Sequence, residues 1–188
     1  MQNKDLKKNF IGIMPMAGEG LRFKKHGHVL PKPFIKINKV PMFLRAAKSF
    51  PSNLRWVFVT NSSVRSKHNI IKSLKIKKKN FFLYLQKKTQ GQASTVYKSL
   101  KYINKTKIII VHSCDLSFKI NFNFFKEKIN ENDLLVFTAK GTSYQLNNHK
   151  QFSWVRKNFN SYEISIKKNF RYKKNLKVLI GTFAFKNK

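Results

Sequence analysis

Residues 11–42 decide the fold of this 188-residue chain, and they read IGIMPMAGEGLRFKKHGHVLPKPFIKINKVPM. An apolar run at residues 10–14 is typical of a short buried strand, and a turn containing Gly18 and Gly20 follows it. Such a turn lets backbone N–H groups approach phosphates closely, and Arg22 adds a charged fork for phosphate oxygens. The spacing fits neither the dinucleotide-binding fingerprint nor the P-loop. An ordinary strand-to-helix turn explains the glycines equally well.

Two prolines bracket a single lysine in the next segment, LPKPF at residues 30–34. We expect Pro31 and Pro33 to hold the backbone of Lys32 extended. A lysine fixed so soon after a phosphate-binding turn is well placed to neutralise a polyphosphate. Because the chain contains 34 lysines, a rigid loop with a solvent-exposed lysine is the alternative.

The rest of the chain alternates between strand-like and helix-like patterns. Strands are expected at residues 10–14, 55–60, 81–85, 107–112 and 134–139. Helices are expected at residues 41–50, 64–74, 92–103 and 124–129. In the third helix the apolar face is expected to comprise Ala93, Val96, Tyr97, Leu100 and Ile103. Three further strands are expected at residues 152–156, 162–166 and 178–185. The pattern predicts one domain of α/β class, a three-layer α/β/α sandwich with a mostly parallel, Rossmann-like mixed sheet.

Two more segments carry candidate functional residues. Gly91 and Gln92 follow the third strand and open a helix, where a glutamine amide could meet a base edge. A simple helix start is the alternative. Asp115 follows the fourth strand, at the sheet edge where ligands of open α/β sheets bind. Magnesium prefers oxygen ligands, and with only 7 acidic residues in the chain Asp115 is the obvious candidate. The alternative is an aspartate that caps a turn.

Residues 11–42 resemble the opening of the sugar nucleotidyltransferase family, within the wider NTP-transferase superfamily. The shared features are an apolar strand, a small-Gly-x-Gly-x-Arg turn, a Pro-Lys-Pro and a Pro-Met at a helix start; the likeness continues more loosely to the end of the chain. The resemblance implies catalytic roles for Arg22, Lys32 and Asp115, with Asp115 as the Mg²⁺ ligand. It implies nucleotide binding by Ala17, Gly18, Gly20, Arg22, Lys32, Gly91 and Gln92. It implies acceptor binding by Lys168 and Gly181.

The resemblance also implies an activity. A nucleoside triphosphate and a sugar 1-phosphate would react with release of pyrophosphate, to make a precursor of surface polysaccharide. Residues 1–140 would then form the nucleotide-binding part and residues 141–188 the strand-rich acceptor part. Members of the family have a second metal-binding aspartate further along, whereas no acidic residue follows Glu163 here. A shortened chain, a partner that completes the site, or a nucleotide binder without catalysis all remain open.

The composition limits other functions. The formal net charge is +33, from 40 Lys and Arg against 7 Asp and Glu, which is typical of nucleic-acid-binding proteins. We favour drift toward lysine and asparagine in an AT-rich genome, because the charge is spread along the chain. Nucleic acid is therefore the less favoured partner, and a homo-oligomer stays open. One cysteine excludes an internal disulfide, and no apolar run is long enough to span a membrane, so we expect a cytoplasmic protein.

Overall fold

The computed structural model describes residues 9–18, 20, 23, 27, 30–62, 80–103, 108–159, 161–166 and 175–186. It divides into two compact units, one made of Met1–Leu135 with Ala184–Lys188 and the other of Val136–Phe183. The helix expected at residues 64–74 lies outside the described residues.

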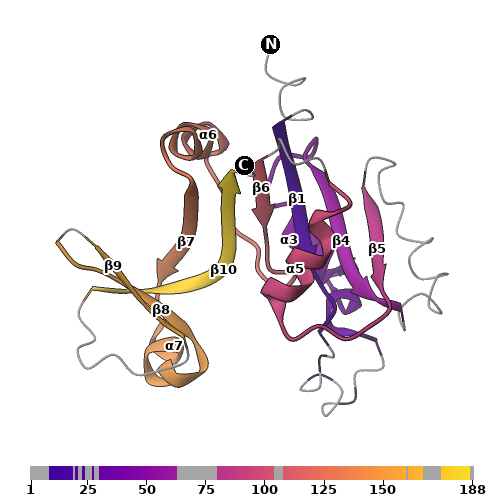
Figure 1. The fold of residues 1–188 in the computed structure, drawn as a ribbon. Helices are drawn as coiled ribbons and strands as arrows, with labels where there is room; N and C mark the ends of the chain where they lie inside the picture. Colours follow the sequence, from indigo (N-terminus) through magenta and orange to yellow (C-terminus); the bar gives the residue numbers. More distant parts are fainter. Residues whose placement is uncertain are drawn as a thin grey trace. The chain divides into compact units, whose positions relative to one another are not determined.

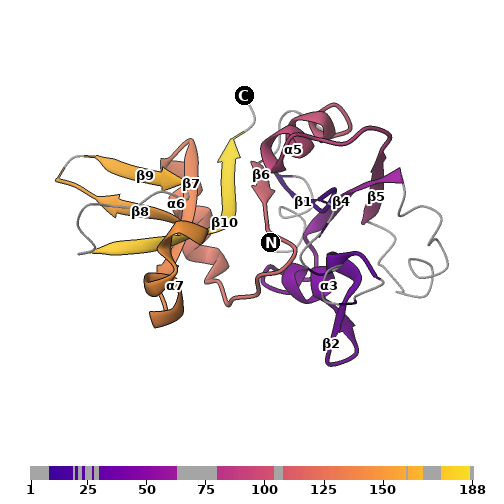
Figure 2. The same cartoon turned by 90° about the horizontal axis from the view of Figure 1, so that it is seen from below.

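A parallel sheet forms the centre of the first unit (Figure 1), in the order β5-β4-β1-β6. Its strands are β1 (Phe10–Pro15), β4 (Arg55–Asn61), β5 (Phe81–Leu85) and β6 (Ile108–Val111). Helices α3 (Met42–Ala47) and α5 (Gln92–Leu100) lie on opposite faces of these strands (Figure 2), so this unit has three layers. The predicted α/β class and mostly parallel sheet are therefore confirmed. Runs of β-branched and aromatic residues buried on both faces are what made these strands readable from sequence.

One face of this sheet is packed with aromatic rings. Gly12 pairs in register with Trp56, and a Cβ at position 12 would lie 2.4 Å from the indole ring. The missing side chain therefore makes room for Trp56, which stacks on Phe58 with ring centroids 6.2 Å apart. Phe43 of α3 meets Phe58 edge to face at 5.0 Å, and this contact fixes the helix on the sheet.

The segment before α3 differs from the expectation in two details. Lys32 lies in a one-turn 3-10 helix, η1 (Lys32–Phe34), and is not extended. The Phe34 N–H donates to the Pro31 carbonyl at 2.9 Å, and burial of the Phe34 ring holds the turn. Pro41 is the N-cap of α3, not its first residue, and lies in a small hairpin of β2 (Lys36–Ile37) and β3 (Val40–Pro41). After α3 the chain continues in tighter turns to Phe50.

The buried face of α5 is rotated from the predicted one. Thr95, Val96 and Ser99 are buried, whereas Ala93 is exposed and Tyr97 is 76% exposed. The hydroxyls of the buried Thr95 and Ser99 donate to carbonyls of their own helix, at 2.9 and 2.6 Å. These small, internally satisfied side chains allow α5 to lie close to β1 and β4, which hydrophobicity alone does not predict.

Two elements complete the first unit. Helix α6 (Phe122–Glu131) begins at Asn121, whose side chain accepts hydrogen bonds from two backbone N–H groups, and it buries Phe125 and Ile129. It confirms and extends the helix expected at residues 124–129. Strand β7 (Leu134–Lys140) then leads out of this unit. No helix in the described part of the chain is long and apolar enough to cross a membrane.

The second unit is built on antiparallel strands. Strand β8 (Ser153–Lys157) pairs with β9 (Tyr162–Ile166) and with β10 (Leu176–Lys186), whose last residues belong to the first unit. Trp154 and Val178 form its core. The structure adds α7 (Ser143–Asn147), which the sequence analysis did not expect, and a single 3-10 turn, η3 (His149–Gln151). A capping box between Thr142 and Gln145 starts α7, and this pattern is visible in the sequence.

Candidate active site

The candidate site forms where β1 and β6 end. These strands are parallel neighbours, so the segments that follow their carboxyl ends leave the sheet at the same edge. The Lys32 ammonium, from the segment after β1, donates a hydrogen bond to the Asp115 carboxylate, from the segment after β6. Two residues that the sequence analysis predicted to be catalytic, 83 positions apart, are thereby in contact.

The environment of Asp115 keeps its carboxylate ionised. Burial alone would raise the pKa of this group, but hydrogen bonds from Lys32 and Ser113 lower it by more, so the pKa lies below its ordinary value. The Ser113 hydroxyl donates to one carboxylate oxygen and Lys32 to the other. A carboxylate that stays charged is a ready ligand for a cation.

Three residues of the predicted phosphate-binding turn after β1 can be described. Gly18 is exposed with open space where a Cβ would lie, and Ala17 is buried. Gly20 has φ +62°, a left-handed conformation that favours glycine. A Cβ there would lie 3.3 Å from the Lys32 Cβ, so Gly20 also lets the lysine segment approach. Arg22 lies outside the described residues.

Gly91 and Gln92 lie after β5, at the same carboxyl edge of the parallel sheet. Gly91 is the N-cap of α5 with φ 154°, a value that L side chains rarely adopt, and its carbonyl accepts the Thr95 N–H at 3.0 Å. Gln92 is exposed at the start of the helix. The local geometry leaves its amide accessible, while its role toward a base stays a prediction.

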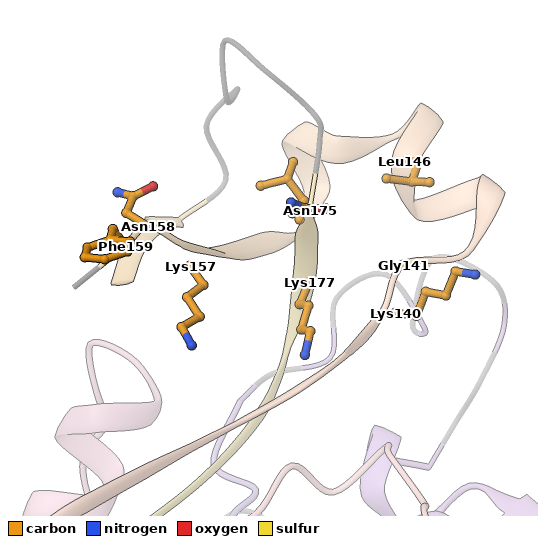
Figure 3. A pocket seen from close by; sticks show the side chains of 9 residues that line it. Lys140, Gly141, Leu146, Lys157, Asn158, Phe159, Asn175 and Lys177 are labelled. Atoms are coloured by element: carbon orange, nitrogen blue, oxygen red, sulfur yellow. The ribbon is translucent and has the colours of Figure 1, made fainter. Parts of the chain in front are cut away.

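Of the two residues predicted to bind the acceptor, only Gly181 can be described, and it belongs to the second unit. Gly181 lies within β10 with φ +66°, and Lys168 lies outside the described residues. This unit contains an open pocket of about 1000 Å³. Figure 3 shows that Lys157 and Lys177 extend in the same direction along it. Gly181 does not line this pocket, so the acceptor role stays a prediction.

Two titratable residues beside Asp115 are buried for packing. Burial, and then the charge of Asp115, raise the pKa of the Cys114 thiol to about 11, so it remains protonated, in agreement with the expected small buried residue. Burial lowers the pKa of His112 to about 4 against the opposing effects of two carbonyls and Asp115. The His112 ring packs against aromatic rings, with Phe50 at 5.3 Å.

The donor set fits magnesium only in combination with phosphates. Among the described residues there is no group of three or more His, Cys, Asp or Glu side chains that could hold a metal. Asp115 offers one charged carboxylate with the Ser113 hydroxyl beside it. Magnesium keeps several waters and is commonly held by one or two carboxylates together with substrate phosphates. The residues present fit that mode of binding.

Sequence reasoning missed two contributors to this site. Ser113 fixes one oxygen of Asp115. Phe23 presents its ring face to the Lys32 ammonium, 5.3 Å from the ring centroid. A serine two positions before a candidate metal-binding aspartate is a local signal that could have been used. The partner of Phe23 depends on the loop conformation, which no sequence pattern revealed.

The chain is similar in fold to several solved structures. An inositol-1-phosphate CTP transferase from T. maritima aligns with TM-score 0.70 at 18% identity, over 93% of this chain and 69% of that chain. A nucleoside-diphosphate-sugar pyrophosphorylase from Vibrio cholerae RC9 aligns with TM-score 0.69 at 19% identity, over 95% and 74%. A UDP-glucose pyrophosphorylase complexed with UDP-glucose aligns with TM-score 0.70 at 20% identity, over 95% and 76%.

The sequence gives no such match: no family model and no curated protein matches it. The structural likeness covers nearly the whole chain, at identities where it demonstrates the fold alone. The expectation drawn from residues 11–42 is confirmed at that level, and the chain has the nucleotide-diphospho-sugar transferase-like fold.

Proposed function

We propose that this chain transfers a nucleotidyl group from a nucleoside triphosphate to a sugar 1-phosphate or a similar phosphorylated acceptor, and releases pyrophosphate. The observation that carries the proposal is the contact between Lys32 and Asp115 at the carboxyl edge of the parallel sheet. Two of the similar structures are an inositol-1-phosphate CTP transferase and a UDP-glucose pyrophosphorylase. Both names join a nucleotide to a sugar or to inositol 1-phosphate, and this supports the same reaction class. The sugar nucleotide formed would serve as a polysaccharide precursor.

The proposed reaction is an in-line displacement at the α-phosphorus. An acceptor phosphate oxygen forms the new P–O bond, and the bond to the leaving pyrophosphate breaks. No covalent intermediate on the protein is needed, so catalysis consists of positioning and charge neutralisation. Lys32 offsets negative charge on the triphosphate, and the backbone N–H groups around Gly18 and Gly20 cradle its oxygens. Magnesium held by Asp115 and the phosphates would supply further charge neutralisation.

The test is pyrophosphate release from a panel of nucleoside triphosphates and phosphorylated sugars, in the presence of magnesium. Replacement of Lys32 with alanine removes one preorganised charge, and we expect the rate to fall by about 10²–10³, by analogy with oxyanion donors. Lys36→Ala is the matched control, because Lys36 is exposed four residues further on. Absence of turnover across the whole panel would argue against the enzyme.

A nucleotide-binding protein without catalysis is the second candidate. The observation in its favour is that, in the part of the chain that the structure describes, Asp115 belongs to no group of three or more His, Cys, Asp or Glu side chains that could hold a metal. Calorimetry separates the two functions. Nucleotide binding that strengthens with magnesium, combined with no pyrophosphate release from any acceptor, would favour the binder.

A further inference from the structure

Both oxygens of the Asp115 carboxylate are occupied by donors of the chain itself. Lys32 donates to one and Ser113 to the other. The side chains of Lys32 and Asp115 are 29% and 36% exposed, so a ligand can reach the pair from solvent. A cation bound to either oxygen would lie beside the ammonium and would weaken its hold on the carboxylate.

Lys32 is held in this contact by its surroundings. Its backbone lies in η1, anchored by the buried Phe34, and its Cβ approaches Gly20. The Phe23 ring lies 5.3 Å from its ammonium and favours a cation there. The lysine is thus arranged for the carboxylate before any ligand is present.

We infer that Lys32 and a divalent cation compete for Asp115, so that the carboxylate accepts the cation only together with phosphates that take over the ammonium. A triphosphate supplies those anions, and this would make nucleotide and cation bind as one unit. The inference rests on the proposed function, because it assigns the ligand of the same site. Lys32 is then the residue that determines which ligands the free protein admits.

A cation beside Asp115 in the free protein would share that carboxylate with the Lys32 ammonium, so two positive charges would face one negative charge. Among the described residues no group of three or more His, Cys, Asp or Glu side chains could compensate. Magnesium also loses its waters reluctantly. When phosphates are present, the ammonium finds new acceptors and the cation gains oxygen ligands, so both penalties disappear together.

The experiment measures binding of Mn²⁺, as a probe for magnesium, to the nucleotide-free protein by calorimetry. We expect weak binding by the wild type and up to about fivefold tighter binding by Lys32→Ala, since an ion pair of this exposure contributes up to about 1 kcal/mol. Lys36→Ala should bind like the wild type. Lys32→Ala combined with Asp115→Asn should lose the gain. Circular dichroism spectra establish that each variant is folded.

Three outcomes would overturn the inference. One is equal Mn²⁺ affinity in the wild type and Lys32→Ala. Another is a gain that survives Asp115→Asn, because the cation would then lie elsewhere. The third is wild-type binding that is as tight without nucleotide as with it. None of these measurements requires turnover, so a protein that shows the competition but releases no pyrophosphate would contradict the proposed function alone.

Discussion

His112 should make the stability of the first unit depend on pH. Its side chain is completely buried, and its Nε2 lies 3.2 Å from the Ala46 carbonyl, which can only accept a hydrogen bond. The neutral ring therefore donates from Nε2. Protonation would place a charge among the rings of Phe50, Trp56 and Phe118, where burial removes its hydration.

The magnitude follows from the two pKa values. Burial lowers the pKa of His112 from 6.5 to about 4 in the folded state. As the pH falls, the unfolded chain binds a proton at His112 before the folded chain does. The contribution of the neutral, buried His112 to the free energy of unfolding is therefore fully present above pH 6.5 and declines as the pH falls to about 4. Each pKa unit corresponds to about 1.4 kcal/mol, so the loss is about 3 kcal/mol. Carboxylates add little in this window, since the chain has only 7 acidic residues.

Urea unfolding between pH 7.5 and 4, followed by circular dichroism and tryptophan fluorescence, measures this loss. His112→Gln should be less stable at pH 7 but should show a much flatter pH dependence. His149→Gln, in the second unit, is the matched control and should keep the wild-type slope. A wild-type stability that is constant from pH 6.5 to 4.5, or an unchanged slope in His112→Gln, would refute the argument.

Four more outcomes are expected. Lys32→Ala should change the urea midpoint little while slowing pyrophosphate release, because the lysine side chain is 29% exposed and an ion pair of this kind contributes at most about 1 kcal/mol. Asp115→Asn should remove most of the magnesium dependence of nucleotide binding measured by calorimetry, and equal dependence in the variant would exclude its metal role. Gly12→Ala should destabilise the fold by about 1–3 kcal/mol in urea titrations, because the new Cβ overlaps the Trp56 ring. Gly181→Ala should cost about 1–2 kcal/mol in the same assay, because φ is +66°.

The sequence predicted the strands of the parallel sheet, where apolar residues follow one another without interruption. Strand β5 has the predicted bounds, β1 and β4 each extend one residue further at their end, and β6 is one residue shorter than predicted at each end. The sequence-based prediction of the buried face failed in α5, where small polar side chains are buried. Thr95 and Ser99 can be buried there because their hydroxyls donate to carbonyls within the helix. Hydrophobic periodicity cannot detect such a face, so it assigned Tyr97 to the core.

The two residues of the candidate site could be selected from the sequence, but their contact could not. The flanking prolines selected Lys32 and its place after a strand selected Asp115, both with the help of the resemblance of residues 11–42. The structure places both at one edge because β1 and β6 are parallel neighbours. Their direct contact could not be predicted, because it depends on the 3-10 turn that Lys32 adopts. The steric restriction before Pro33 favours an extended backbone, but the buried Phe34 ring stabilises the turn.

In a chain with 40 cations and 7 acids, an ion pair alone is weak evidence for a site. Every acidic residue in the described ranges forms an ion pair with a lysine or arginine. Besides Asp115, these residues are Glu127, Glu131, Asp133 and Glu163.

Three features distinguish the Asp115 pair from those four. Its carboxylate is the least exposed of the five and holds a second donor, Ser113. Its partner is 83 positions away, in a segment that Gly20 allows to approach. It lies after two adjacent parallel strands, at the edge where ligands of such sheets bind. Drift toward lysine explains the surface pairs, but it does not explain why one lysine is built into this position.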